Sequence, residues 1–320
     1  MQRLILAVMA CASVLQGATV LRLAHGLNTE HPVHKAMIFM AQRVNEYSAG
    51  ELIVEVYPNE QLGNEKECIE AIQLGYLAMT KISSGAMESF VSRYKIFGIP
   101  YLFDDSEHFW KVCNGEVGKK LLLSGESKRL RGLCFYDAGA RSFYAGKSIN
   151  TPADLSADGK TMKVRVMGSP MASELISTMG GAPTPISWGE LYTSLDQGVV
   201  DAAENNPPSY LTSRHYEITK FYSLDEHTRL PDLLVISTRV WAKLTEQEQQ
   251  WLQAAVDESV TYQRKIWEES EAEAMKFLKE SGVTIIYPDK ASFVEAVSPM
   301  WEKYMDTELG ELITEIRGIK

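Results

Sequence analysis

The sequence predicts an α/β protein of two lobes, with one long helix lying across both. The chain has 320 residues, more than one small domain usually needs, so two lobes are expected. Runs typical of strands alternate with stretches that have helical spacing of apolar residues, which favours βαβ units and a mostly parallel sheet. Residues 245–281 contain neither Pro nor Gly, which predicts a helix far longer than the average of about 11–12 residues.

The first half supplies four of the expected strands and its main helices. Pro32 begins a helix that runs to about Ser48, and residues 65–74 form a second helix that Gly75 ends. A loop at 100–105 precedes a further helix. The strands are expected at residues 20–24, 52–57, 79–83 and 133–136.

The second half repeats this style. Strands are expected at 141–145, 163–166 and 199–203. Ser187 and Glu190 have the spacing of a capping box, so a helix is expected from there to Gly198. In both halves a helix ends at a Gly and a short strand follows. Two lobes of related design explain this parallel, and chance explains it equally well.

The long helix has its own start and stop signals. Thr245 and Glu248 form a second capping box, and Gly282 supplies the stop. At ~1.5 Å per residue the segment reaches roughly 50 Å, which is long enough to lie across two lobes. Two helices broken near Ser270 are the alternative.

Charge and motifs exclude several classes of protein. The formal net charge is -10 and no run of Lys or Arg occurs, which argues against a nucleic-acid partner. The chain has no GxGxxG after a strand, no GxxxxGK[ST], no HExxH and no GxSxG, so no catalytic activity and no cofactor are expected.

The N-terminus has the order of a secretory signal peptide. Arg3 precedes an uncharged apolar run from Leu4 to Leu15, and Gln16-Gly17-Ala18 ends in small residues, so a signal peptide is predicted over 1–18. The run is shorter than the about 20 residues that span a bilayer. The chain is therefore expected to be exported to the periplasm. A buried N-terminal element and a lipid anchor on Cys11 are the alternatives, although Met9 fits a lipobox poorly.

Cysteine and histidine patterns predict no metal site. After Cys11, three cysteines remain, and export permits a disulfide, but the sequence does not choose a pair. His31 and His34 are three residues apart without a third ligand nearby, which favours a loop or helix start. The three cysteines are Cys68, Cys113 and Cys134.

Three polar or aromatic residues suggest a site for an acid. Arg165 lies in the apolar strand 163–166, where a guanidinium needs an anion, either a ligand carboxylate or an internal partner. Asn205 follows a strand, where ligands collect in open α/β sheets, and it is equally suited to the turn before Pro207. Trp188 at a helix start either belongs to the core or stacks on a sugar.

Taken together, the segments resemble the DctP family, the substrate-binding proteins of tripartite ATP-independent periplasmic (TRAP) transporters. The resemblance covers nearly the whole mature chain. Its landmarks here are His31-Pro32, Tyr57-Pro58, Gln61-Leu62-Gly63, Gly98-Ile99-Pro100-Tyr101-Leu102, Lys163-Val164-Arg165-Val166, Pro183-Thr184-Pro185, Glu190-Leu191-Tyr192, Gly198, Val200-Asp201 and Glu204-Asn205.

The resemblance implies a two-lobe flytrap of the periplasmic binding protein type, with a long helix spanning both lobes. It implies lobe I over 19–139 plus 231–270 and lobe II over 140–230 plus 271–320. It also implies a small organic acid as ligand, membrane permease subunits as partners, and a monomer in solution.

The resemblance also assigns a ligand site. The family's carboxylate-binding arginine falls on Arg165, a second arginine on Arg141, and the ligand-contacting asparagine on Asn205. Further candidates are an acidic residue for the polar end of the ligand, an aromatic that packs on it, and groups at strand ends facing the cleft: Glu65, Trp188, His25, Ser83 and, more weakly, His227.

The ligand class follows from residues 204–210, 215–217 and 223–227, which resemble family members that bind sugar acids. A hexuronate such as glucuronate or galacturonate, or a related aldonate, is expected, while a keto acid or C4-dicarboxylate stays open. Glu65 suits hydroxyls and repels a second carboxylate. Two other functions remain: an exported lyase of sugar acids using Glu65 and His25, and a sensor that presents a bound acid to a receptor.

Overall fold

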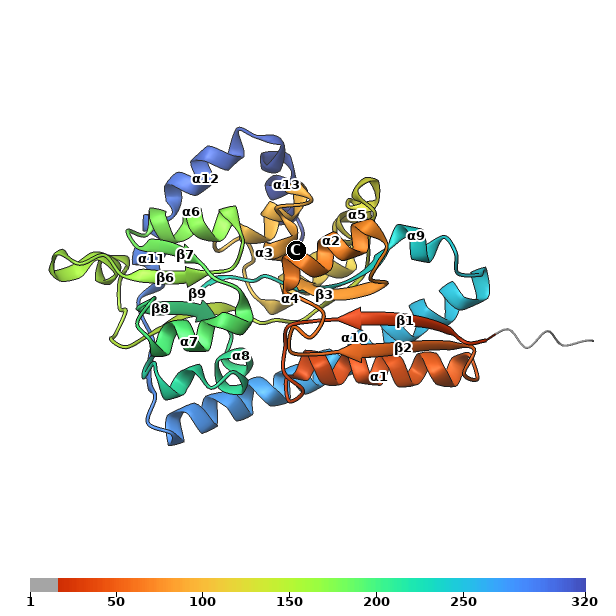
Figure 1. Ribbon diagram of the computed structural model, residues 1–320. Helices are drawn as coiled ribbons and strands as arrows, with labels where there is room; N and C mark the ends of the chain where they lie inside the picture. The colour runs from red at the N-terminus through yellow and green to blue at the C-terminus, as the bar shows by residue number, and fades with distance from the viewer. Residues whose placement is uncertain (1–16) are drawn as a thin grey trace, which may run out of the picture.

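Two mixed β-sheets form the framework of the protein in the computed structural model, which describes residues 17–320 (Figure 1). We call the part built around the first sheet lobe I. Its strands, in the spatial order β2-β1-β3-β10-β4, are β1 (Thr19–Ala24), β2 (Leu52–Tyr57), β3 (Met79–Ser83), β4 (Leu130–Tyr136) and β10 (Asp232–Ser237). The predicted signal peptide lies outside the described residues except for its last two positions.

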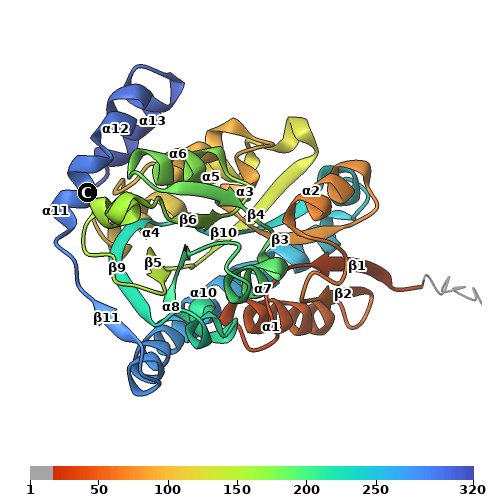
Figure 2. The ribbon, with the colours of Figure 1, turned by 60° about the vertical axis from the view of Figure 1, so that its left-hand side comes forward.

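Lobe II is built around the second sheet, whose spatial order is β11-β9-β5-β8-β6-β7. The two sheets lie next to each other, and one long helix runs beneath both (Figure 2). The predicted two-lobe α/β fold is therefore confirmed. The strands are β5 (Arg141–Ala145), β6 (Lys163–Val166), β7 (Ala182–Pro185), β8 (Ala202–Asn205), β9 (Phe221–Thr228) and β11 (Thr284–Ile286).

The sheets are less parallel than the sequence indicated. In lobe I, β10 runs antiparallel to both β3 and β4, and in lobe II, β5 runs antiparallel to both β8 and β9. The cause is the path of the chain. It passes from β4 into β5 and from β9 into β10 without an intervening helix, so two strands enter their sheets in the opposite sense.

Helices surround the lobe I sheet, and the three that the sequence predicted, at about 32–48, at 65–74 and after 105, are among them. Asn64 caps α2 reciprocally with Glu67, and Gly75 ends it in the left-handed region at φ 85°. The elements are α1 (Pro32–Tyr47), α2 (Glu65–Leu74), α3 (Ser84–Met87), η1 (Ser92–Gly98), α4 (Ser106–Asn114), α5 (Glu116–Leu123), η2 (Glu126–Lys128) and α9 (Thr238–Trp241).

In lobe II, two predictions from the sequence are wrong. Glu190 N donates to the backbone oxygen of Ser187 at 3.3 Å, the Ser187 hydroxyl caps nothing, and only a short turn η4 (Trp188–Glu190) begins there. The predicted strand at 199–203 starts later, because Val199 N still bonds back to the preceding helix. The helices are η3 (Pro152–Gly159), α6 (Pro170–Thr178), α7 (Leu191–Asp196), α8 (Pro207–Thr212) and η5 (His215–Glu217).

One unbroken helix, α10 (Glu246–Glu280), crosses beneath both lobes (Figures 1 and 2). The Thr245–Glu248 capping box is formed, and the alternative of a break near Ser270 is wrong. Gln263 of α10 holds the first crossing segment between the lobes. Its amide accepts from Asp137 N at 2.8 Å and donates to Asp137 O at 2.9 Å.

The C-terminal helices lie on the side of the molecule away from α10 (Figure 1). Lys303 and Tyr304 bond to Glu174 of α6 at 2.7 Å each, whereas Ile316 O bonds to His108 of α4 at 3.0 Å. These contacts reach both lobes, so the residue boundaries expected for the lobes stay a prediction. The helices are α11 (Lys290–Ala296), α12 (Ser298–Met305) and α13 (Glu308–Arg317).

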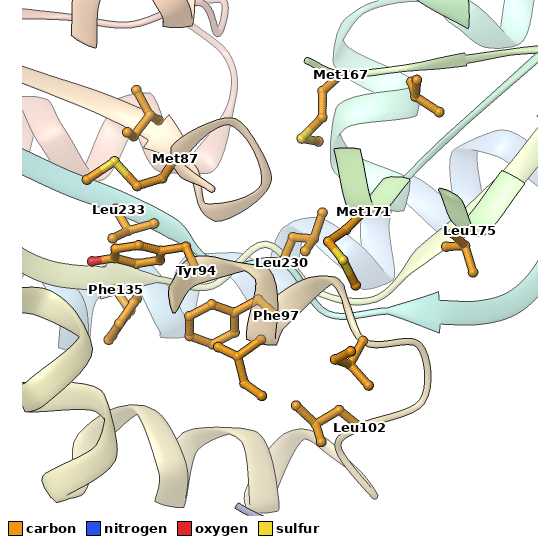
Figure 3. Close-up of a cluster of buried hydrophobic side chains, with 14 of the residues drawn as sticks. Met87, Tyr94, Phe97, Leu102, Phe135, Met167, Met171, Leu175, Leu230 and Leu233 are labelled. Atoms are coloured by element: carbon orange, nitrogen blue, oxygen red, sulfur yellow. The ribbon is translucent and has the colours of Figure 1, made fainter. Parts of the chain in front are cut away.

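The largest apolar cluster joins the two lobes. Figure 3 shows Met171 of α6 beside Leu230, with the Phe97 ring of η1 on the other side of Leu230 and with Met87 and Met167 above them. Among the described residues, no helix is both long and apolar enough to cross a membrane. In the same part of the chain the cysteines are free and buried, namely Cys68, Cys113 and Cys134.

Candidate ligand-binding site

A cavity lies between the lobes, with about 530 Å³ of empty space that includes open solvent. It is formed where β3, β6 and β8 end and β10 begins, and a wider outer chamber adjoins it through Glu65, Arg165, Met167 and Trp188. The polar residues lining the inner cavity are Glu65, Lys81, Ser83, Arg141, Arg165, Asn205, Asn206, Ser209 and Asp232.

Arg165 carries an uncompensated charge into this cavity. Its side chain is 3% exposed, its Nε donates to Ile186 O at 2.9 Å, and its guanidinium lies 5.5 Å from the centre of the Trp188 ring. Among the described residues it forms no salt bridge. Burial lowers the pKa of Arg165, yet a guanidinium stays protonated, so the buried cation lacks an anion.

Arg141 differs, because its positive charge is paired with a carboxylate of the protein itself. Its guanidinium makes a two-pronged ion pair with Glu204, including Nη2 to Oε1 at 2.9 Å, and Nη1 donates to Asn205 Oδ1 at 3.0 Å. Burial alone would raise the pKa of Glu204, but the charge of Arg141 and the bond from His227 lower it to about 2. Arg141 is thus a fixed donor group at the cavity wall.

His227 lies behind the cavity rather than in it. Its Nδ1 bonds to Asp225 at 2.7 Å and its Nε2 lies 3.5 Å from Glu204. Burial would lower the pKa of His227, but Asp225 and Glu204 raise it to about 9, so the ring is a cation at neutral pH. The ring lines a separate, mainly apolar cavity with Leu230 and others.

The side-chain amide of Asn205 has free hydrogen-bond donors. Its Oδ1 accepts from Arg141, from Asn206 N at 2.9 Å and from Asn206 Nδ2 at 3.0 Å. These three donors fix the amide orientation and direct Nδ2 elsewhere. Within the described chain Nδ2 donates to no residue, so it is available to a ligand oxygen. Asn206 then begins α8, because its Oδ1 accepts from Ser209 N at 2.8 Å.

Lobe I contributes a charged trio on the opposite wall. Lys81 Nζ lies 3.1 Å from Asp232 and 3.7 Å from Glu65, and Glu65 Oε1 accepts from Ser83 N at 2.8 Å. Lys81 and Asp232 were missed by sequence reasoning. A lysine within the otherwise buried run of β3 was the available signal, since lysine is almost never fully buried unless paired.

His25 is not brought into the cavity. Its Nδ1 accepts from Leu27 N at 3.1 Å and its Nε2 bonds to His34 at 3.0 Å, so both ring nitrogens are occupied. Burial, with Lys81 and the neighbouring histidines, lowers the pKa of His25 to about 2. Its neighbours Gly26 and Leu27 line the cavity in its place.

Trp188 lies at the mouth of the inner cavity and lines both chambers. Its ring is held edge-on against His215 at 5.2 Å. Beside it, Glu60 of lobe I reaches across and accepts from Gly189 N at 3.3 Å. Across the described residues, His, Cys, Asp and Glu form no cluster able to hold a metal ion.

Comparison with known proteins agrees with this architecture. The family model of bacterial extracellular solute-binding protein, family 7 (DctP) matches residues 23–308. An uncharacterised protein of Salmonella typhimurium, YiiZ, is 38% identical over 303 residues, which cover 93% of this chain and 91% of the relative.

Two solved structures of TRAP periplasmic solute-binding proteins are similar throughout. The protein from Xanthobacter autotrophicus Py2, with bound β-D-galacturonate, is 36% identical at a TM-score of 0.90 and covers 94% of this chain and 100% of that one. The protein from Polaromonas sp. JS666, bound to D-erythronate, is 31% identical at a TM-score of 0.90, with coverages of 94% and 99%. The chain therefore belongs to the DctP family, the periplasmic solute-binding proteins of TRAP transporters.

Proposed function

We propose that this protein captures a sugar acid with a single carboxylate, a hexuronate such as D-galacturonate or D-glucuronate. The observation that carries the proposal is Arg165, a buried guanidinium without an ion-pair partner among the described residues. A ligand carboxylate supplies the missing charge and fits the planar fork of the guanidinium. Arg141 Nη1 and Asn205 Nδ2 lie on the same wall and complete the carboxylate contacts.

The opposite wall favours hydroxyl groups. Glu65 and Asp232 together outweigh the single charge of Lys81, so a second carboxylate there would be repelled. The same groups offer acceptors and donors to sugar hydroxyls. Trp188 at the mouth suits the C–H face of a sugar ring. Galacturonate and erythronate in the two similar proteins are acids of this kind.

The chain binds its acid without transforming it. His25, which a lyase would use as an acid, has both ring nitrogens bonded internally. Ligand binding shifts the two lobes towards the closed form, which membrane permease subunits then recognise. The protein acts as an exported monomer after removal of a signal peptide at 1–18, and the lobe boundaries are those expected from the sequence.

The test is a thermal-shift screen of the mature protein against uronates, aldonates, keto acids and dicarboxylates. A ligand that binds only the folded state raises the melting temperature. We expect a large shift with D-galacturonate or D-glucuronate and none with succinate. A shift confined to dicarboxylates or keto acids refutes the sugar-acid proposal, and turnover of any acid refutes the assignment as a binding protein.

A further inference from the structure

Glu88 links the two lobes through its carboxyl group. It directly follows α3 of lobe I and its side chain is buried, with 3% exposed. Its Oε1 accepts from Ser169 Oγ at 2.9 Å and from Met171 N at 2.7 Å. Ser169 is the N-cap residue of α6 in lobe II, so a lobe I carboxylate completes the cap of a lobe II helix.

The second carboxyl oxygen of Glu88 is buried without a partner among the described residues. Close packing surrounds it: a Cβ on Gly98 would lie 3.6 Å from this oxygen and only 2.6 Å from Met171 Cβ. The charges that act on its pKa are those of Lys95 of η1, which lowers it, and Glu174 of α6, which raises it. Burial raises the pKa of Glu88 to about 7, despite the bonds from Met171 and Ser169.

The segment that Glu88 holds is the one that carries Arg165. β6 ends at Val166, and the chain turns through Met167 and Gly168 into the cap at Ser169. Ser89 Oγ donates to Gly168 O at 3.3 Å, which adds a second lobe I contact to the same turn. Met167 and Met171 bury their side chains against lobe I beside it (Figure 3).

We propose that Glu88 is a positioning residue for ligand binding, which fixes the β6–α6 turn against lobe I as the cleft closes and takes up a proton in doing so. The inference rests on the proposed capture of an acid by closure. Opening of the cleft separates the carboxyl from Ser169 and Met171 and returns it to water. Closing encloses it again with one oxygen unpaired, which disfavours the charged form.

The linkage has a definite sign. In water the Glu88 carboxyl has its ordinary pKa of 4.5, and in the closed cleft its pKa is about 7. Closure is therefore fully favoured below pH 4.5 and loses this contribution as the pH rises through 7. Between pH 6 and pH 8 the affinity should fall about tenfold.

Three histidines near the cleft keep one protonation state in this window, whereas the Glu60 carboxyl, which also joins the lobes, has its pKa raised by burial. The pKa of His25 is lowered to about 2 by burial and Lys81, and that of His215 to about 3 by burial and Arg165. The pKa of His227 is raised to about 9 by its carboxylate partners in spite of burial. A fall in affinity between pH 6 and 8 is thus traceable to Glu88 by substitution.

The experiment is calorimetric titration with D-galacturonate at pH 6, 7 and 8. Glu88→Gln keeps an acceptor for Ser169 and Met171 but does not titrate, so its affinity should vary less than twofold. Glu88→Ala should bind more weakly at every pH. Glu174→Gln is the control, since it removes a neighbouring carboxylate paired with Lys303 and Tyr304, and it should keep most of the fall because Glu174 contributes least to the raised pKa of Glu88.

Proton uptake gives a second readout. At pH 7 the wild-type binding heat should differ between phosphate and Tris buffers by the equivalent of about half a proton, and the Glu88→Gln heat should not. An equal pH dependence in wild type and Glu88→Gln overturns the inference, as does a flat wild-type profile. If D-galacturonate binds neither protein, the hexuronate proposal fails. In that case the melting temperatures of the two proteins test the inference. The melting temperature of wild type minus that of Glu88→Gln should fall from pH 6 to pH 8, and a constant difference overturns the inference.

Discussion

Glu204 holds Arg141 in a buried two-pronged ion pair, while Arg165 on the same cavity wall has no carboxylate of its own among the described residues. Two guanidiniums therefore line one cavity, and only that of Arg141 is ion-paired within the described residues. The ion pair fixes the position of Arg141, and the unpaired charge of Arg165 favours binding of an anionic ligand.

Arg165→Ala should weaken binding of D-galacturonate by about 2–5 kcal/mol, the usual cost of removing one partner of a buried charge pair. The melting temperature of the ligand-free variant should not fall, because the substitution removes an unpaired buried charge. Calorimetry and thermal unfolding measure the two effects. Unchanged affinity in a folded variant would exclude Arg165 from the site.

Glu204→Gln should behave differently from Arg165→Ala. It breaks a buried pair and leaves the Arg141 cation uncompensated, with His227 paired only to Asp225, so unfolding should become easier by about 3–5 kcal/mol. Ligand affinity should also fall, because Arg141 loses its fixed orientation. Denaturant unfolding in the presence and absence of D-galacturonate separates the two losses. A variant as stable as wild type contradicts the ion-pair account.

The raised pKa of His227 predicts alkaline sensitivity. Its folded-state pKa of about 9 exceeds the ordinary value of 6.5, so its contribution to stability is complete below pH 6.5 and is lost as the pH rises through 9. The free energy of unfolding of wild type relative to His227→Gln should therefore shrink between pH 7 and pH 10. A difference that does not change with pH would mean that the ring is neutral.

Local signals predicted much of this fold because they act within a few residues. The bounds of β2, β3, α2, β5 and β6 follow from alternation, helical spacing, a Gly at the helix end and strand-breaking turns. The antiparallel pairing of β10 was not predictable in this way, since it depends on which sheet the chain enters after β9. The start of β8 depends on both kinds of contact, since Val199 N and Val200 N bond back to Ser194 O, whereas Asp201 N bonds to Lys163 O of β6.

The residues of the candidate site likewise divide into those that the sequence predicted and those that depend on tertiary contacts. The residue types at Arg165 and Asn205 pointed to acid binding, and both line the cavity. The resemblance to a family placed Arg141, Glu65, Ser83 and Trp188, which line it as well. His25 and His227 lie at strand ends too, but the sequence did not reveal that His34, Asp225 and Glu204 occupy their rings. Partner choice among buried groups is a property of the assembled fold.

Glu65→Gln should alter selectivity rather than abolish binding. The substitution keeps an acceptor for Ser83 N but removes one of two negative charges beside Lys81. Repulsion of a second carboxylate is reduced, so the affinity ratio of D-galacturonate to the dicarboxylate galactarate should fall by about tenfold, or ~1.4 kcal/mol. Competition titrations with the two acids give this ratio. An unchanged ratio would place the far end of the ligand away from Glu65.

Trp188→Ala should distinguish a ring-shaped ligand from an open chain. The indole lies at the mouth of the inner cavity, braced by His215 on one side and close to the Arg165 guanidinium on the other. A pyranose ring offers a flat C–H face to such a surface, whereas an extended aldonate offers less, so galacturonate should lose about 0.5–1.5 kcal/mol more than D-erythronate does. Calorimetry on both acids with both proteins forms a double comparison. Equal losses would mean that Trp188 positions Arg165 rather than contacting the sugar ring, because the contact between Arg165 and a carboxylate is common to both ligands.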